Sequence, residues 1–202
     1  MKKELLRQSI HLIGILFVLA AQFLTKAQAI LMFFMIGMAF LAYSQYIQVV
    51  RKQFFGLRKI MMKFERGNES WPFTGAIWFY TGCFFSFLLF PFPIASAASA
   101  TLAIGDGLST LVGKGIGRHK VCGHKTLEGF LGFVIGSFLI SLIWVKPWLA
   151  VIGAVVGGLI ELGVSAKEID KHRRRGWIDD NWLIPVGVGF VLFVLSFLTE
   201  SL

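Results

Sequence analysis

The stretch WPFTGAIWFYTGCFFSFLLFPFPIASAASATLAI, residues 71–104, decides the fold class because it contains no charged residue. It is long enough to cross the hydrocarbon core of a bilayer twice, since one helical crossing takes about 17–25 residues. Proline removes a backbone donor and disfavours helix in the residue before it. Pro91 and Pro93 therefore divide the stretch, and we expect two membrane-crossing helices, 71–90 and 94–113.

The rest of the chain is also rich in apolar residues and poor in charged ones. Of its 202 residues, 56% are hydrophobic and 15% are charged, whereas a soluble domain has about 25% charged residues. The sequence therefore predicts an integral membrane protein, an all-α bundle of about seven transmembrane helices in a single membrane-embedded domain, residues 1–202. The seven expected spans are 9–25, 27–50, 71–90, 94–113, 129–145, 147–166 and 183–199.

The positive charges indicate the orientation. Seven spans place 18 of the 20 Lys and Arg residues on one side, in the N-terminus and in the connections 51–70, 114–128 and 167–182. Only Lys26 and Lys146 lie on the other side. Positive residues favour the cytoplasmic side, so we expect a cytoplasmic N-terminus. The net charge of +9 is then a consequence of topology, and we expect no nucleic-acid partner.

Three segments allow a second interpretation. Residues 1–29 have features of a secretory signal, with Lys2 and Lys3 before an apolar run and Ala27-Gln28-Ala29 after it. Because Glu4, Arg7 and His11 interrupt the apolar run, we favour a retained helix. Residues 51–67 mix basic and apolar side chains and predict either a helix in the headgroup layer or a solvated linker. Cys122 with His119 and His124 fits no standard zinc spacing, and no disulfide framework is expected.

Ionisable groups at the edge of membrane helices indicate function, because they are costly unless paired. The first cluster is Glu4, Arg7, Gln8 and His11, whose spacing places them on one helical face; an ordinary charged helix start is the alternative. The second, Arg66 with Asn68 and Glu69, is by itself a polar loop. Both clusters are expected on the cytoplasmic side.

The third cluster fills the stretch Gly105–Gly129. Glycine lets backbone N–H groups approach a phosphate, and Lys or Arg neutralises it. An acid lies at each end, as a divalent cation bound to a triphosphate requires. The spacing is not that of a Walker A loop, and a flexible basic connector is the alternative. The candidate residues are Asp106, Ser109, Gly113, Lys114, Gly115, Gly117, Arg118, Lys125, Thr126, Glu128 and Gly129.

The fourth cluster comprises Glu161, inside span 147–166, and Asp179, Asp180 and Asn181 before the last span. Glu161 has no ionic partner in its own helix. Pairing with Arg7 or Lys125 across the bundle is the structural interpretation, and a site carboxylate is the functional one.

These residues together resemble the CTP-dependent lipid-alcohol kinases, the family of dolichol kinase, phytol kinase and the CTP-using diacylglycerol kinase. The resemblance covers nearly the whole chain. One departure is Arg7-Gln8, where the family usually has Arg-Lys. The motifs that carry it are Glu4 to His11, Arg66 to Glu69, Gly105-Asp106 to Ser109, Gly113-Lys114, Lys125-Thr126-Leu127-Glu128-Gly129, Glu161, and Asp180-Asn181 with Pro185.

The resemblance implies transfer of the γ-phosphoryl group of CTP to the hydroxyl of a lipid alcohol, with catalysis on the cytoplasmic face. Asp106 with Glu128 would hold Mg²⁺ or another divalent cation, and Arg7 would reach the transferred group. Glu161 or Asp180 would accept the hydroxyl proton or complete the metal site, with Glu4, His11, Glu69 and Asn181 as possible support. The basic residues and glycines of 113–129 would hold the triphosphate.

Two alternatives stay open. A similar arrangement of motifs occurs in phosphatidate cytidylyltransferases, although their Ser-Pro-Lys-Lys loop and later Gly-His-Gly-Gly block are missing here. A non-enzymatic lipid or ion transporter would use Asp106 and Glu161 as an ion path. It predicts polar residues on both sides of the bilayer, whereas this sequence concentrates them on one.

Overall fold

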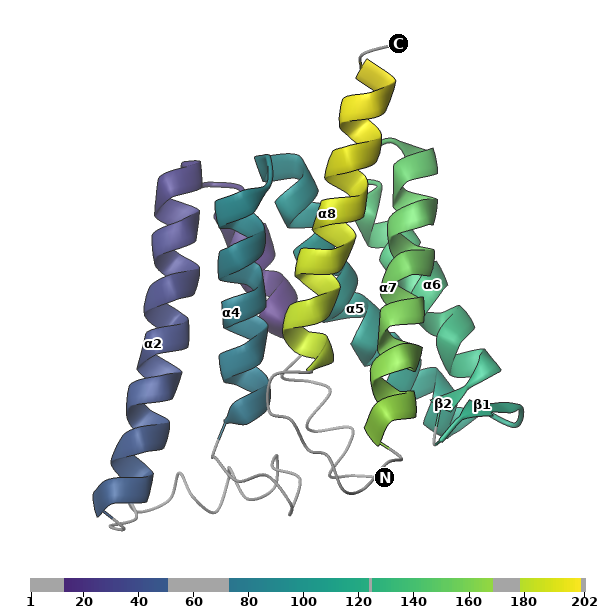
Figure 1. Ribbon diagram of the computed structural model, residues 1–202, viewed down its shortest axis with the longest axis horizontal. Helices are drawn as coiled ribbons and strands as arrows, with labels where there is room; N and C mark the ends of the chain where they lie inside the picture. Colours follow the sequence, from purple (N-terminus) through teal and green to yellow (C-terminus); the bar gives the residue numbers. More distant parts are fainter. Residues whose placement is uncertain (1–12, 51–72, 124, 169–178, 201–202) are drawn as a thin grey trace.

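The computed structural model describes residues 13–50, 73–123, 125–168 and 179–200. These residues form a bundle of roughly parallel and antiparallel helices with one small hairpin (Figure 1). Residues 13–21 form the first helix of the described chain. The elements that follow are α2 (Lys26–Val50), α4 (Thr74–Leu89), α5 (Phe92–Gly115), β1 (Lys120–Cys122), β2 (Lys125–Thr126), α6 (Leu127–Ser141), α7 (Pro147–Glu168) and α8 (Asp180–Glu200).

The predicted helical architecture is confirmed, and each helix overlaps one of the expected spans. The division at the prolines is confirmed as well, since α4 ends at Leu89 and α5 begins at Phe92, with Pro91 as its N-cap and Pro93 in its first turn. Proline is tolerated there because the first N–H groups of a helix have no intrahelical partner.

Three described helices are long and apolar enough to cross a membrane, over Lys26–Tyr46, Pro147–Ser165 and Asp180–Thr199. The apolar helices α4 and α6 are shorter. The chain is therefore a helical membrane protein. Seven crossings and a cytoplasmic N-terminus stay predictions.

Helix α5 lies at the centre of the bundle and packs against α4, α6, α7 and α8. Its Ala, Ser and Thr residues are fully buried over much of its length. Small side chains let membrane helices approach closely, and the spaces they leave are filled by rings such as Phe133 of α6, which lies against Gly105 and Gly157. This packing brings four other helices to within side-chain reach of α5.

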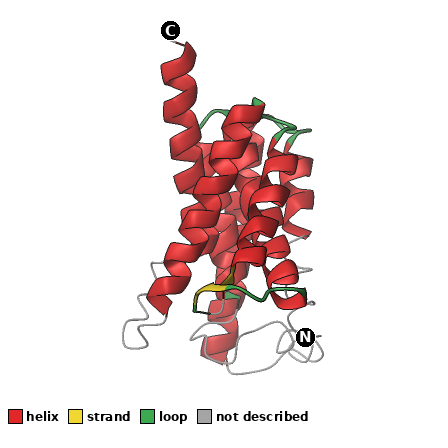
Figure 2. Ribbon diagram, turned by 90° about the vertical axis from the view of Figure 1, so that its right-hand side faces the viewer, coloured by secondary structure: helices red, strands yellow, loops and turns green. Residues whose placement is uncertain are grey.

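Successive helices run in opposite directions, so the same end of the bundle collects several chain segments (Figures 1 and 2). The last turns of α5 and α7, the hairpin, and the first turns of α6 and α8 all lie there. We call this end the hairpin end. The far end contains the short turns at 22–25, 90–91 and 142–146.

The β hairpin is a difference from the all-α prediction. Strand β1 pairs antiparallel with β2, with Lys120 opposite Thr126 and Cys122 opposite Lys125. Gly123 between them has φ 56°, a left-handed conformation that favours glycine. The connection 114–128 is thus largely structured, because α5 continues to Gly115 and the hairpin begins at Lys120, so the alternative of a flexible connector is not supported.

Candidate functional site

A buried ion pair at the hairpin end joins α7 to β2. Glu161 is fully buried, and the Lys125 ammonium donates a hydrogen bond to its Oε1 atom. The Ser109 hydroxyl of α5 donates to the other carboxylate oxygen, Oε2, at 3.1 Å. Of the two ionic partners that the sequence suggests for Glu161, the structure shows Lys125.

Two further carboxylates lie near enough to attract the same ammonium electrostatically. Burial alone would lower the pKa of Lys125, but attraction to Glu161, Asp106 and Asp180 outweighs it and raises this pKa above the ordinary 10.5. Asp106 is buried on α5, and Asp180 begins α8. We call Asp106, Ser109, Lys125, Glu161 and Asp180 the Lys125 cluster. Its members come from four elements that are far apart in the sequence.

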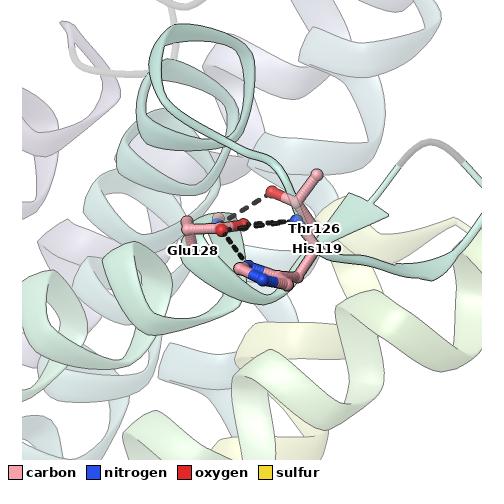
Figure 3. A network of polar contacts seen from close by, with 4 residues as sticks. His119, Thr126 and Glu128 are labelled. Carbon is pink, nitrogen blue, oxygen red and sulfur yellow. Dashed lines mark hydrogen bonds and ion pairs between the residues drawn. The ribbon is translucent and has the colours of Figure 1, made fainter.

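Glu128 has a different set of neighbours, shown in Figure 3. Its carboxylate lies 2.6 Å from Nδ1 of His119 and accepts the His119 backbone N–H at 3.2 Å. Hydrogen bonding by His119 lowers the pKa of Glu128 to about 2. Glu128 therefore ties the start of α6 to the residue before β1, across nine positions of the chain.

Thr126 is the N-cap of α6, because its hydroxyl accepts the Gly129 backbone N–H at 3.1 Å (Figure 3). The Leu127 N–H donates to the His119 carbonyl at 2.8 Å. These bonds fix the hairpin and the first turn of α6 as one rigid corner. An N-cap of this kind typically contributes about 1 kcal/mol to stability.

The glycines of this region lie where chain segments approach closely. A Cβ atom at Gly129 would be 2.8 Å from the Ser109 carbonyl oxygen, and one at Gly117 would be 2.1 Å from the Gly113 carbonyl oxygen. Gly113 and Gly115 belong to the last turn of α5, which presents carbonyl groups rather than free N–H groups. The N–H groups expected to approach a phosphate are therefore those of the turn after α5, because Leu127 and Gly129 at the start of α6 already donate to His119 and Thr126.

The predicted cluster at the start of α8 is held together locally. The Asp179 carboxylate accepts the Asn181 backbone N–H at 2.9 Å and its side-chain amide at 2.8 Å. Pro185 lies buried inside α8 and cannot donate to the Asn181 carbonyl four residues earlier. That carbonyl lies against Gly82 of α4, where an added Cβ would be 2.6 Å away. Asn181 thus fixes α8 against α4.

The structure brings together part of the predicted site. Asp106, Ser109, Lys125, Glu161 and Asp180 form the Lys125 cluster, while Thr126, Glu128 and Gly129 form the adjoining corner. Lys114 ends α5, and Arg118 is exposed in the turn after it. Arg7, Glu4, His11 and Glu69 lie outside the described residues.

Sequence reasoning missed the role of His119, which it considered only as a zinc ligand. The alternation around Val121 and the glycine at 123 are hairpin signals. A hairpin over 120–126 would have placed His119 beside the first turn of α6, and so beside Glu128.

The oxygen and nitrogen donors near the Lys125 cluster indicate whether a divalent cation could bind there. The described residues contain no group of three or more His, Cys, Asp or Glu side chains arranged to hold a metal ion. Mg²⁺ commonly takes only one or two protein carboxylates together with substrate phosphates. Asp106, a buried hard oxygen donor, fits that requirement together with substrate phosphates, whereas both oxygens of Glu161 accept hydrogen bonds from Lys125 and Ser109, so Glu161 would have to release Lys125 to bind a metal.

Comparisons with known proteins give two relatives. A phytol kinase from Synechocystis sp. is 34% identical over 123 residues, which cover 58% of this chain and 50% of the kinase. The matched region thus spans about half the length of that kinase. The uncharacterized protein MJ1137 from Methanocaldococcus jannaschii is 30% identical over 200 residues, 94% of this chain and 93% of that protein. No family model matches the chain, and no solved structure matches it significantly.

Proposed function

Because the chain belongs to the same family as MJ1137 and is similar to a phytol kinase over more than half its length, we propose that it is an integral membrane lipid-alcohol kinase. It transfers the γ-phosphoryl group of CTP to the hydroxyl of a lipid alcohol at the cytoplasmic face. The acceptor class is a polyprenol such as dolichol, a phytol-like isoprenoid alcohol or diacylglycerol.

The observation that carries this proposal is the Lys125 cluster. Three carboxylates and one ammonium from α5, β2, α7 and α8 share a space at one end of an apolar bundle. Charged groups in such a place are costly unless paired, and they indicate a functional site. Phosphoryl transfer requires positioning and charge neutralisation rather than covalent chemistry by the protein, which is what this group of side chains offers.

Each group has a proposed part. Asp106, with Glu161 or Glu128 as the second oxygen donor, holds Mg²⁺ or another divalent cation, which neutralises phosphate charge when bound. Lys125 neutralises the phosphates as a point charge, assisted by the exposed Lys114 and Arg118. The backbone of Gly117 lines the phosphate path. Arg7 approaches the transferred group from the N-terminal segment.

The chemical step joins the lipid hydroxyl oxygen to the γ-phosphorus and breaks the bond from that phosphorus to the β-phosphate oxygen. CDP leaves, and the hydroxyl proton passes to a carboxylate. Glu161 or Asp180 accepts this proton: Glu161 is fully buried, Asp180 is half-buried, and both lie near the ammonium of Lys125. Lys125 then offsets the charge that builds up on the phosphates.

The test is a comparison of CTP labelled at the α phosphorus with CTP labelled at the γ phosphorus. The purified protein is incubated with Mg²⁺ and a panel of lipid alcohols, with ATP and GTP as alternative donors. We expect the lipid product to carry label from the γ position only. Label from the α position in a phosphatidate-dependent reaction would identify a cytidylyltransferase. If CTP is not consumed with any alcohol, the proposal of kinase activity is wrong and a transporter is favoured.

A further inference from the structure

Three large apolar side chains are exposed on the corner that the hairpin and the first turn of α6 form at the edge of the bundle (Figure 1). Ile116 in the turn after α5 is 68% exposed, Val121 of β1 is 53% exposed, and Leu127 at the start of α6 is 44% exposed. We call these three side chains the corner patch. Exposed apolar patches of this kind indicate a surface that contacts a membrane or a partner.

Backbone contacts bring the members of the corner patch together. The N–H of Leu127 donates to the carbonyl of His119, two residues before Val121. A Cβ atom at Gly117, the residue after Ile116, would lie 2.5 Å from the hydroxyl oxygen of the residue that precedes Leu127. Each member is therefore at most two residues from a close contact with a neighbouring segment of the corner.

The corner patch continues a lipid-facing surface. Leu127, Leu131, Ile135 and Leu139 are all exposed on α6, and their spacing of four places them along one face of that helix. In a helical membrane protein, an exposed stripe of large apolar side chains faces the hydrocarbon. Because Leu127 belongs both to the stripe and to the corner patch, the lipid-facing surface extends from α6 onto the corner.

The length of α6 places the corner near the border of the hydrocarbon layer. Its 15 residues are about 22 Å long at about 1.5 Å per residue, whereas the hydrocarbon core is ~30 Å thick. A helix this short does not reach both borders, and apolar side chains beyond its ends cover the difference. The exposed Ile143 continues the apolar surface at the far end, and Val121 and Ile116 continue it at the hairpin end.

Positive charge surrounds the corner patch. Residues 114–127 contain four Lys or Arg residues and no Asp or Glu. Lys125 is neutralised in the Lys125 cluster, whereas Arg118 and Lys120 are exposed. The next acid, Glu128, is already bound to a histidine of the corner. Exposed cations beside apolar side chains favour a bilayer surface with anionic lipid, because the apolar groups enter the hydrocarbon border while the cations stay with the head groups.

From these observations we propose that the corner docks on the anionic phospholipid head groups of the protein's own membrane. Ile116, Val121 and Leu127 enter the border of the hydrocarbon layer. Lys120 contacts lipid phosphate, and the neighbouring Arg118 adds to the positive potential. The proposed kinase site uses neither Lys120 nor any member of the corner patch, so this surface is independent of the proposed function.

The direct test uses the full chain in lipid nanodiscs, with an environment-sensitive fluorophore on Cys122, the half-buried thiol next to Val121; Cys83 is buried. The discs contain phosphatidylcholine alone or with phosphatidylglycerol, and a lipid with a nitroxide near its head group is the quencher. We expect about twofold stronger quenching in the anionic discs, and loss of this increase at high salt. Equal quenching in both kinds of disc would overturn the proposal. Quenching by aqueous iodide alone would also overturn it and indicate a surface for a soluble partner.

A matched pair of lysine variants tests the charge. Lys120→Glu reverses a charge on the corner, whereas Lys146→Glu makes the same change at an exposed lysine of the far end. We expect Lys120→Glu to abolish the increase in anionic discs and Lys146→Glu to retain it. The same response from both variants would contradict the proposal. Both side chains are exposed, so the fold should be retained, and size-exclusion chromatography checks it.

A second pair tests the apolar contact. Leu127→Ser removes a member of the corner patch, whereas Leu139→Ser removes an exposed leucine from the other end of the same stripe. We expect Leu127→Ser to lower lipid quenching about twofold in both kinds of disc, with Leu139→Ser equal to the wild type. Unchanged quenching in Leu127→Ser would mean that the corner lies outside the hydrocarbon border. The comparison of lipids with the wild type remains informative if Leu127→Ser does not fold.

Inorganic triphosphate distinguishes lipid phosphate from nucleotide phosphate, since Arg118 also has a part in the proposed kinase site. At constant ionic strength, we expect triphosphate to leave the increase in anionic discs unchanged. Loss of the increase would assign the cations of the corner to the nucleotide and overturn lipid docking. Quenching does not depend on turnover, so a failed kinase assay and a failed docking test are distinguishable.

Discussion

Lys125 and Glu161 lie 36 positions apart in the chain, yet the ammonium of one donates to the carboxylate of the other at the buried edge of the bundle. The lysine side chain is 24% exposed, whereas Glu161 is completely buried. Breaking the ion pair therefore has different consequences for the two side chains. Glu161 has no access to solvent if the pair is broken, while Lys125 retains some.

This inequality predicts different costs for the two single changes. Lys125→Met leaves a buried carboxylate without its cation, which should lower the unfolding free energy by about 3–5 kcal/mol. Glu161→Gln should cost less, because the lysine is partly hydrated and still near Asp106 and Asp180. Denaturation in detergent measures both, with Lys120→Met on exposed β1 as the control. Equal costs, or a double variant whose cost is the sum of the two, would contradict the coupling.

Asp106→Asn tests the proposed metal-binding carboxylate. The variant keeps the shape of the side chain but removes a charge, so we expect turnover to fall by at least about 100-fold, with the protein still folded in the membrane. Label transfer from CTP measures activity, and thermal unfolding in detergent measures the fold. Activity close to that of the wild type would rule out Asp106 as the metal ligand.

Gly129 predicts a steric effect. An alanine there would bring Cβ to 2.8 Å from the Ser109 carbonyl oxygen, which must force α5 and α6 apart at a cost of about 1–3 kcal/mol. Gly163 on α7 has nothing within 4 Å of the same position, so Gly163→Ala should stabilise the helix by about 0.5–1 kcal/mol. Melting temperatures of the two variants should therefore move in opposite directions. A parallel shift would mean that the contact between α5 and α6 is looser than described.

The ion pair of Glu128 with His119 predicts that the stability of the fold depends on pH in the acid range. Its pKa is lowered from 4.5 to about 2 by His119, so the folded state holds the charged form more tightly than the unfolded state does. The stabilisation is fully present above pH 4.5 and is lost as the pH falls through 2. We expect the difference in melting temperature between wild type and Glu128→Gln to shrink across this interval. Because Glu128 is near the surface, the effect should be small, and a difference that is constant with pH would contradict it.

The helical fold could be predicted because its signals are strong and local. The uncharged stretch 71–104 and the two prolines at its centre are enough to predict α4 and α5 without reference to the rest of the chain. The segregation of 18 of the 20 Lys and Arg residues to one side supports seven spans, because a missing span would scatter the charges, but the number of crossings stays a prediction.

The sequence singles out the charged residues that the structure brings together, but of their pairings it offers only Lys125 with Glu161, and that as one of two alternatives. Asp106, Lys125 and Glu161 are conspicuous because polar groups are rare in such a sequence. Which carboxylate meets which cation depends on helix rotation and on the hairpin. The local sequence does not show that His119 takes Glu128 while Lys125 takes Glu161.

Because successive helices run in opposite directions, the two ends of the molecule should differ in how well they tolerate inserted segments. Every short turn at the far end, such as residues 142–146, is separated from the Lys125 cluster by the length of a helix. An epitope or a rigid fusion partner grafted into such a turn would enlarge the protein for imaging while leaving the chemistry at the opposite end intact.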